Sequence, residues 1–148
     1  METSGFFIAY MYRSIIYLFL GVLLAGCSIG RLTKMGVYSE LPPTEYLSYV
    51  NDSSVNIIDV RTVSEYEKTH ISGAVNVNYF GGHFMDDLAT LDLDTNKVTL
   101  IYCETQHRSL FVAKKVYAMG FRSIIDLDKG MIRWRKKGFP FVGDTLQN

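Results

Sequence analysis

The stretch Val98-Thr99-Leu100-Ile101-Tyr102 is an unbroken run of β-branched and large apolar residues, and the polar stretch Cys103-Glu104-Thr105-Gln106-His107-Arg108-Ser109 follows it at once. An apolar run without polar alternation is typical of a short strand that is buried on both faces. Residues Ser109 to Met119 then have helical spacing, and Gly120 ends them. The sequence therefore predicts a strand, a tight polar loop and a helix, with Cys103 at the carboxyl end of the strand.

The same alternation of strands and helices continues on both sides of this unit. We expect strands at Val55–Val60, Ala74–Val77, Val98–Tyr102 and Ile124–Leu127, and helices at Pro42–Val50, Ser64–Lys68, Phe84–Leu91, Ser109–Met119 and Met131–Lys137, with Thr44 and Ser64 as N-caps. Strands that alternate with helices favour an α/β fold, with a parallel β-sheet and helices on both faces.

The position of Cys103 favours a reactive thiolate. Ligands of open α/β sheets bind at the carboxyl ends of the strands, and a loop that leads into a helix can turn its backbone N–H groups toward an anion. Arg108 adds a permanent positive charge and a fork of donors. The alternative is a buried cysteine that acts as a small hydrophobic residue. The five polar or charged residues that follow Cys103 argue against that alternative.

Four motifs, in the same order along the chain, resemble the rhodanese family of sulfurtransferases. The spacing Cys-x4-Arg-Ser resembles the active-site loop of that family. The other three are the Asp-Val-Arg…Glu-Tyr, His-Ile-x-Gly-Ala and Gly-Gly-x-x-x-Trp segments, which correspond here to Ile57–Arg61 with Glu65-Tyr66, to His70–Asn76 and to Asp128–Trp134. The resemblance runs from about Leu41 to Val142 and implies one rhodanese-like domain.

The resemblance implies that Cys103 is the catalytic nucleophile. It would take a sulfane sulfur from a donor such as thiosulfate or a persulfide, carry it as a persulfide, and pass it to a thiol or to cyanide. The loop that binds the anion would consist of Glu104, Thr105, Gln106, His107, Arg108 and Ser109. Asp59, Arg61 and Glu65 would support the site, with an ion pair between Arg61 and Glu65. No cofactor and no metal is required.

Loop length and composition separate the related chemistries. Phosphatases and arsenate reductases of this fold have five residues between Cys and Arg, so the four residues here favour sulfur over phosphorus. Glu104 places a negative charge beside the nucleophile, which counts against thiosulfate as the natural donor. Gln106 replaces a frequent glycine. His107 has two open roles, tuning the thiolate or facing solvent, whereas we expect His70 to bond local backbone.

The first residues resemble a bacterial lipoprotein signal. A short basic start at Met11-Tyr12-Arg13 leads into an apolar run that ends in the lipobox Leu24-Ala25-Gly26-Cys27. Cys27 would be acylated, and Met11 is an alternative translation start. A membrane-spanning helix is the other interpretation, but a span needs about 20 apolar residues. We therefore expect a signal peptide over 1–26, a tether over 27–40, the domain over 41–143 and a tail over 144–148.

Composition limits the remaining possibilities. Removal of residues 1–26 leaves 122 residues, which is enough for one domain. Acidic and basic residues balance at 15 each, so no nucleic-acid partner is indicated. With Cys27 lipidated, Cys103 is the sole thiol and no internal disulfide can form. Expected partners are a small sulfur donor, a thiol acceptor or a protein sulfur acceptor. We also expect the exported chain to be held by its lipid anchor on a bacterial membrane, facing the periplasm or the cell exterior.

Three function classes follow. The first is a sulfurtransferase. The second is a non-turnover sulfur carrier or protein-binding module of the same fold. The third, a phosphatase or arsenate reductase, is disfavoured by the loop length.

Overall fold

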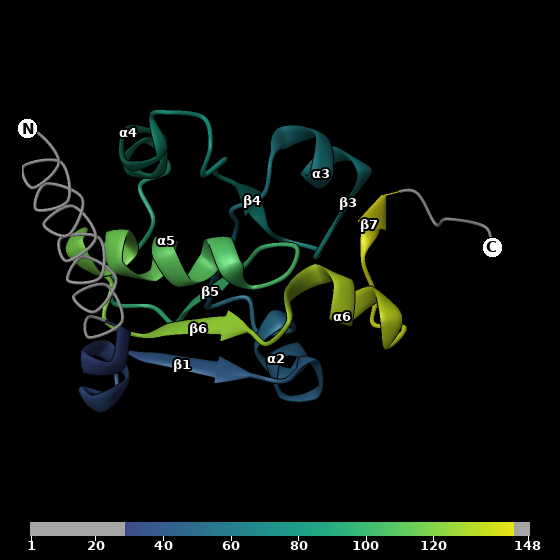
Figure 1. The fold of residues 1–148 in the computed structure, drawn as a ribbon, viewed down its shortest axis with the longest axis horizontal. Helices are drawn as coiled ribbons and strands as arrows, with labels where there is room; N and C mark the ends of the chain where they lie inside the picture. Colours follow the sequence, from purple (N-terminus) through teal and green to yellow (C-terminus); the bar gives the residue numbers. More distant parts are fainter. Residues whose placement is uncertain (1–28, 144–148) are drawn as a thin grey trace, which may run out of the picture.

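The computed structural model describes residues 29–143. A five-stranded parallel sheet lies at its centre (Figure 1). The strand order is β1-β6-β5-β2-β4, and a second, two-stranded sheet pairs β3 with β7 in antiparallel fashion. The strands are β1 (Tyr38–Leu41), β2 (Asn56–Asp59), β3 (Thr69–His70), β4 (Val75–Asn76), β5 (Thr99–Tyr102), β6 (Ile124–Leu127) and β7 (Val142–Gly143). The predicted α/β class with a parallel sheet is confirmed.

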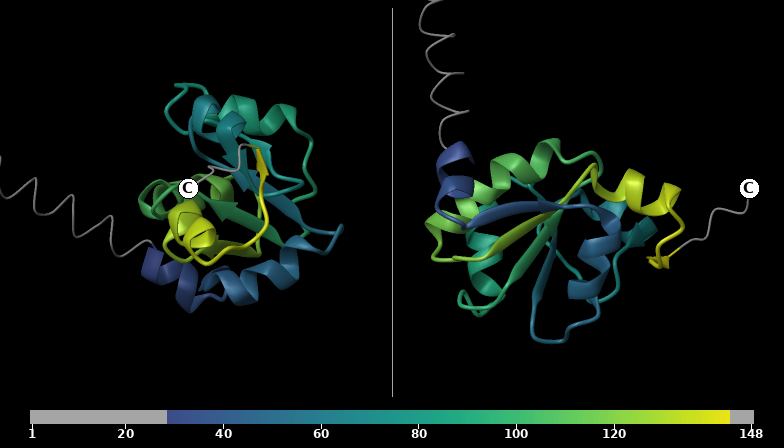
Figure 2. Two further views of the ribbon diagram at one scale, coloured as in Figure 1. Left: turned by 90° about the vertical axis from the view of Figure 1, so that its right-hand side faces the viewer. Right: turned by 90° about the horizontal axis from the view of Figure 1, so that it is seen from below.

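Helices cover both faces of the twisted sheet, whose strands fan out in the right-hand view of Figure 2. They are α2 (Pro43–Val50), α3 (Val63–Lys68), α4 (Phe84–Thr90), α5 (His107–Ala118) and α6 (Gly130–Lys136), and residues 29–34 are also helical. The predicted helices and strands all occur, with ends shifted by no more than two residues. The sequence reasoning missed β1, β3 and β7.

Alternate residues of each strand separate into two apolar layers, as the two-residue period of a strand requires. One layer contains Ile58, Ile101 and Ile124, which pack against α4 and α5. The other layer contains Leu100 and Ile125, which pack against α2 and α6. Cys103 belongs to the α5 layer, so its side chain lies between the sheet and that helix.

Strand β5 lies between β2 and β6, with all three strands parallel. Their carboxyl ends therefore meet at one edge of the sheet, where Asp59, Cys103 and Asp126 lie at or near the ends of neighbouring strands. This topology puts Cys103 at the middle of the edge where α/β proteins bind ligands.

The expected tether over 27–40 is wrong for its described part. Residues 29–34 are helical, Tyr38–Leu41 forms the edge strand β1 beside β6, and Leu32 and Val37 are buried. The apolar residues of this segment are too few to show a period in the sequence, yet they complete the core at the edge of the sheet.

Both predicted N-caps are also wrong. Pro42 is the N-cap of α2, and no side chain caps that helix. Helix α3 begins one residue earlier than expected, so its cap is Thr62, which forms a reciprocal capping box with Glu65. The capping box therefore fixes Glu65 at the start of α3 through purely local contacts.

Three predictions fall on residues that the structure does not describe: the signal peptide, the lipidation of Cys27 and the tail over 144–148. Within 29–143, each helix is too short or too polar to cross a lipid bilayer.

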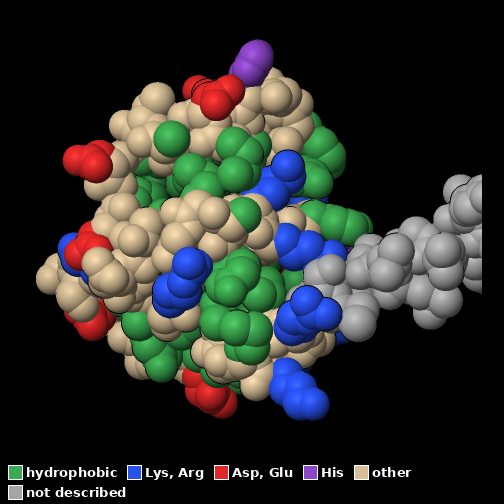
Figure 3. Space-filling view, turned by 90° about the vertical axis from the view of Figure 1, so that its left-hand side faces the viewer, with side chains coloured by type: hydrophobic (Ala, Val, Ile, Leu, Met, Phe, Trp, Pro, Cys, Tyr) green, Lys and Arg blue, Asp and Glu red, His purple; other side chains and the backbone are tan. Residues whose placement is uncertain are grey.

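The face at the amino ends of the strands carries separate Lys and Arg side chains around hydrophobic ones (Figure 3).

Candidate active site around Cys103

Cys103 lies directly after β5 and has no exposed surface. Helix α5 begins four residues later, after Gln106, whose φ of 76° places it in the left-handed region. No side chain caps α5. Since the first N–H groups of a helix have no partner within it, those of α5 remain available to an anionic group.

The N-terminus of α6 holds the loop through its backbone. Met131 N donates to the Cys103 carbonyl oxygen at 2.8 Å, and Ile132 N donates to that of Glu104 at 3.1 Å. Gly130 has a φ of 62°, and a Cβ there would lie 2.7 Å from the Glu104 carbonyl oxygen. Gly130 therefore allows two backbones to touch, which explains the glycine in the motif before Trp134. Trp134 itself is buried in the core.

Arg61 organises the charged side of the loop. Its guanidinium donates to the Asp59 carboxylate at 2.7 Å and to Glu104 Oε2 at 3.0 Å, and it also reaches the Thr69 carbonyl. Burial by itself lowers the pKa of Arg61, but the hydrogen bonds and charge of Asp59 and the bond to Glu104 outweigh it and leave the pKa above its usual value. Arg61 is thus a charged and almost fully buried anchor.

The expected ion pair between Arg61 and Glu65 is wrong. Glu65 instead receives two hydrogen bonds from Arg108, at 2.7 and 2.6 Å. These bonds, together with those from Thr62, lower the pKa of Glu65 to about 2 despite partial burial. Two local features keep Arg61 and Glu65 from pairing. Arg61 folds back onto Asp59, two residues earlier, and Glu65 is fixed by the capping box.

Arg108 stands beside the cysteine. Its hydrogen bonds to Glu65 raise its pKa, and the nearby Cys103 adds to that shift. The Phe80 ring lies 5.6 Å from the guanidinium carbon. The Arg108 side chain is 17% exposed, so it is the cation next to the buried sulfur that solvent can also reach.

Glu104 does not present an unpaired negative charge to the nucleophile. Its carboxylate is bonded by Arg61 and also by Arg135 of α6, which the sequence reasoning missed. The physical basis for doubting thiosulfate as donor is correspondingly weaker. A cavity of about 210 Å³ lies here, lined by Arg61, Glu65, Lys68, Thr69, Glu104 and Arg135.

The histidines and their neighbours have local partners. His107 Nδ1 lies 3.0 Å from Thr105 Oγ1, and both residues are exposed, so His107 faces solvent. His70 Nδ1 lies 2.9 Å from the Tyr66 carbonyl oxygen, which agrees with the expected bond to local backbone.

Asn76 Nδ2 donates to the carbonyls of Asp59 and Arg61, both at 3.0 Å, and so fixes the loop after β2.

A polar network behind the cysteine was not foreseen. Ser109 Oγ lies 3.7 Å from Cys103 Sγ and 2.9 Å from Asp126 Oδ2, and Tyr38 donates to the same Asp126 oxygen at 3.0 Å. Burial raises the pKa of Asp126 to about 8, against the opposing effect of its hydrogen bonds. The available signal was a lone acidic residue inside the apolar stretch Ile124-Ile125-Asp126-Leu127.

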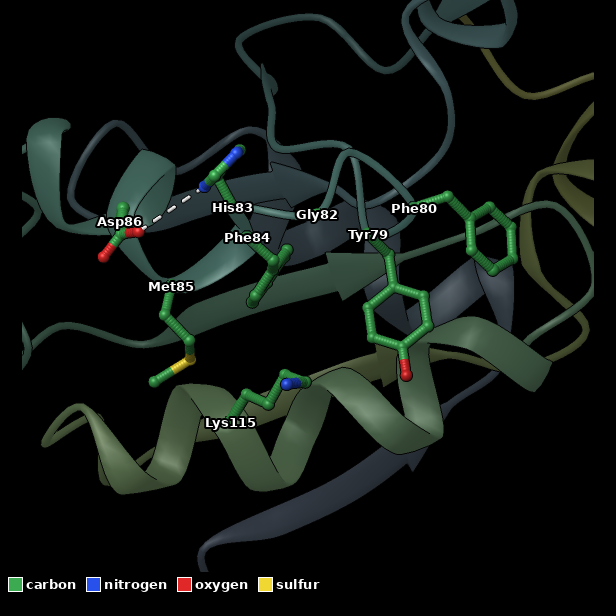
Figure 4. A pocket seen from close by; sticks show the side chains of 8 residues that line it. All are labelled: Tyr79, Phe80, Gly82, His83, Phe84, Met85, Asp86 and Lys115. Atoms are coloured by element: carbon green, nitrogen blue, oxygen red, sulfur yellow. Dashed lines mark ion pairs between the residues drawn. The ribbon is translucent and has the colours of Figure 1, made fainter.

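A larger cavity, of about 440 Å³, flanks the site between the segment 79–86 and α5 (Figure 4). Aromatic side chains and Met85 form much of its lining, and Lys115 reaches it from α5. Phe80 connects this cavity to Arg108. The cavity thus continues the surface that adjoins the cysteine loop. Within 29–143, no group of three or more His, Cys, Asp or Glu side chains is arranged to hold a metal ion.

Fold and site define a class of α/β proteins in which a cysteine after the central strand begins a tight loop that leads into the N-terminus of a helix. Residues 42–137 match the family described as the rhodanese-like domain, and the chain belongs to this family.

Two curated relatives are similar over most of the domain. A thiosulfate sulfurtransferase, GlpE of Pseudomonas entomophila, is 26% identical over 114 residues, which cover 76% of this chain and 96% of that protein. YrkF of Bacillus subtilis, a candidate sulfur carrier protein, is 34% identical over 87 residues, which cover 59% of this chain. The chain spans only 45% of the length of YrkF.

A solved structure supports the fold. The polysulfide-sulfur transferase homodimer of Wolinella succinogenes has a TM-score of 0.62 at 21% identity, with 83% of this chain and 92% of that chain covered. The parallel sheet and its helices are therefore those of rhodanese-like proteins.

Proposed function

We propose that this protein is a sulfurtransferase that carries a sulfane sulfur as a persulfide on Cys103. The observation that carries the proposal is the position of Cys103 beside both the uncapped N-terminus of α5 and the Arg108 guanidinium. Both features stabilise negative charge on sulfur. The sulfurtransferase name of GlpE and the family membership support the same chemistry.

The reaction has two displacements. The Cys103 thiolate attacks the outer sulfur of a donor such as thiosulfate, the donor S–S bond breaks, and sulfite leaves with the electron pair. A thiolate or cyanide then attacks the outer sulfur of the persulfide, and the Cys103 thiolate is regenerated. No net oxidant is required in either step.

Access to the sulfur involves Arg108. Because Cys103 has no exposed surface, a donor must displace a neighbouring group before it reaches the sulfur. Arg108 bonds the half-buried Glu65 and lies near enough to Cys103 to interact with its charge. In this proposal the guanidinium exchanges Glu65 for the anionic end of the donor, so one positive charge serves both the resting and the loaded site.

The test is the formation of thiocyanate from thiosulfate and cyanide. Cys103→Ser should abolish turnover, and Arg108→Ala should raise the KM for thiosulfate roughly tenfold, as expected when a charge-assisted hydrogen bond of about 1.5 to 3 kcal/mol is lost. Arg122→Ala is the matched control, because the described contacts of Arg122 are local ones, to the carbonyls of Tyr117 and Phe121 and to the Tyr117 ring. Turnover by Cys103→Ser at the wild-type rate would refute the enzymatic role.

A carrier without turnover is the second candidate, and the burial of Cys103 together with the name of YrkF favours it. A carrier would accept one sulfur per chain from a donor but would release it neither to cyanide nor to small thiols. Multiple turnovers with any small acceptor would exclude this candidate.

The anchoring of the chain is a separate part of the proposal. The lipobox that ends at Cys27 supports export and lipidation, and the exposed Arg31 and Lys34 follow closely, where they would face anionic lipid headgroups. Metabolic labelling with a fatty acid should tag the wild-type chain and not Cys27→Ser. Equal labelling of the variant, or a wild-type chain that fractionates as soluble, would reject the anchor.

A further inference from the structure

Four side chains connect the sulfur to the edge of the sheet. Ser109 Oγ lies 3.7 Å from Cys103 Sγ and 2.9 Å from Asp126 Oδ2. The Tyr38 hydroxyl lies 3.0 Å from the same Asp126 oxygen and 3.1 Å from Glu40 Oε1. Cys103, Ser109 and Asp126 are all fully buried. Each of these hydroxyls must therefore find its partner within the protein.

Ser109 has one proton and three acceptors. The acceptors are the Cys103 sulfur, the Asp126 carboxyl and the Gln106 carbonyl oxygen at 2.9 Å. A hydroxyl donates one hydrogen bond, so the protonation state of Asp126 determines where that bond goes. A neutral Asp126 can donate to Ser109, whereas an ionised Asp126 can only accept from it.

We propose that Asp126 is a positioning residue that controls, through Ser109, how well negative charge on the Cys103 sulfur is stabilised. This inference rests on the proposed sulfur transfer, in which Cys103 Sγ receives the electron pair when the S–S bond of the persulfide breaks. With Asp126 neutral, Asp126 donates to Ser109, Ser109 donates to the sulfur, and Tyr38 donates to Glu40. With Asp126 ionised, Ser109 and Tyr38 both donate to Asp126, and the sulfur loses its donor and gains a nearby anion.

Two observations favour the neutral form in the resting protein. Asp126 Oδ1 is buried and has no hydrogen-bond partner among the residues described, a situation that is costly for a carboxylate. Burial raises the pKa of Asp126 to about 8, and the charge of Glu40 raises it further, against the hydrogen bonds from Ser109 and Tyr38. Burial and the charge of Asp126 also raise the pKa of Tyr38, so Tyr38 remains a donor.

The titratable groups that face Asp126 come from three elements. They are Tyr38 and Glu40 of β1, Tyr46 of α2, and Cys103 after β5, which is reached through Ser109. Tyr38 and Glu40 precede the segment 42–137 that matches the family. The outer half of the network is thus contributed by the edge strand that the sequence reasoning missed.

The experiment measures a single turnover from persulfidated protein to cyanide between pH 6.5 and 9.5. Asp126→Asn is nearly isosteric and cannot ionise, so its rate relative to wild type should be about one at pH 6.5 and should rise to about tenfold at pH 9.5, the effect of one hydrogen bond to a charged group. Asp87→Asn, in the exposed first turn of α4, is the control and should give a flat ratio. Parallel profiles for Asp126→Asn and wild type would overturn the proposal.

A second pair of variants tests whether the effect passes through Ser109. Ser109→Ala should slow the transfer at pH 6.5 by about tenfold, and in that background the gain from Asp126→Asn at pH 9.5 should fall well below tenfold, to what removal of the Asp126 charge alone contributes. An undiminished tenfold gain without the hydroxyl would overturn the route. If Asp126→Asn does not fold, Tyr38→Phe replaces it: loss of that donor disfavours ionised Asp126, so the fall in wild-type rate should move to higher pH. An unmoved fall would contradict the network.

The two proposals fail in different ways. If mass spectrometry of the donor-treated protein shows no sulfur on Cys103 with any sulfane donor, the proposed sulfur-transfer function is rejected. The role of Ser109 is then still tested by thiolate absorbance, because Ser109→Ala should form the thiolate only at higher pH than wild type. Coincident absorbance curves would reject the stabilising bond itself.

Discussion

The two sides of the cysteine loop are held by different forces. On the α6 side, apart from the Arg135 pair with Glu104, the backbone holds the loop: Gly130 lets N–H groups reach the carbonyls of Cys103 and Glu104. On the α3 side, charged side chains hold the loop: Arg61 binds Glu104, and Glu65 binds Arg108. The backbone contact depends on the absence of a side chain and is insensitive to pH and salt. The charged contacts respond to both, so the two sides should fail under different conditions.

Gly130→Ala should have the largest effect, because it blocks the backbone side directly. The new Cβ would overlap the Glu104 carbonyl group, and the positive φ adds about 1 to 2 kcal/mol of strain. We expect a loss of about 5 kcal/mol in the free energy of unfolding, measured by urea denaturation, which approaches the whole stability of a small domain. Gly82→Ala is the control, since Gly82 has a φ of 83° but no atom near its Cβ position. Equal losses in the two variants would show that contact with the loop is unimportant.

Arg61→Met should be the most damaging change on the charged side. It leaves the fully buried Asp59 carboxylate without its cation, which costs about 3 kcal/mol of stability. The double variant with Asp59→Asn removes that uncompensated charge and should recover part of the loss in thermal or urea unfolding. A double variant less stable than Arg61→Met alone would contradict this account of the pair.

Glu65→Gln should remove an acid-dependent contribution. The folded pKa of Glu65 is about 2, below its usual value of 4.5, so its stabilisation is present above about pH 4.5 and is lost as the pH falls through 2. Because the side chain is partly exposed, we expect about 1 to 2 kcal/mol. Wild type should therefore lose that much more stability than Glu65→Gln between pH 5 and about 2. The control Glu67→Gln, at an exposed position, should follow wild type.

Lys129→Gly should have the smallest effect, and it should be stabilising. Lys129 is exposed and has a φ of 60°, and it stands where the family motif has its first glycine. Relief of the left-handed strain exceeds the entropic cost of glycine by about 0.5 kcal/mol. Lys136→Gly, in the helical conformation of α6, should instead destabilise. A loss of stability for Lys129→Gly would mean that the lysine side chain makes a contribution of its own.

The backbone side was accessible from the sequence because its determinants are local. The apolar strand before Cys103 and the glycine before Trp134 lie within short motifs, and the expected strand and helices occur with small shifts. At two positions the chain has another residue where the family pattern has glycine. Gln106 and Lys129 both have positive φ, so each non-glycine residue there occupies a conformation that glycine adopts without strain.

The charged side and the buried network could not be predicted in the same way. Arg108 and Glu65 are 43 residues apart, and Tyr38 and Asp126 are 88 apart, so their pairing depends on the strand order and not on any local pattern. Several acceptors were available to Arg61, and it bonds Asp59 and Glu104 because the capping box and Arg108 hold Glu65 elsewhere. Strand β1 was missed because its four residues show no strand pattern of their own. They form a strand because they pair with β6.

The most direct test of the central claim is the mass of the peptide that contains Cys103 after the protein has been treated with thiosulfate or a persulfide donor. We predict a gain of one sulfur atom on Cys103 that cyanide or a reducing thiol removes, with no gain in Cys103→Ser. A donor-treated protein whose Cys103 peptide keeps its mass, while an added alkylating agent still modifies that residue, would contradict the account.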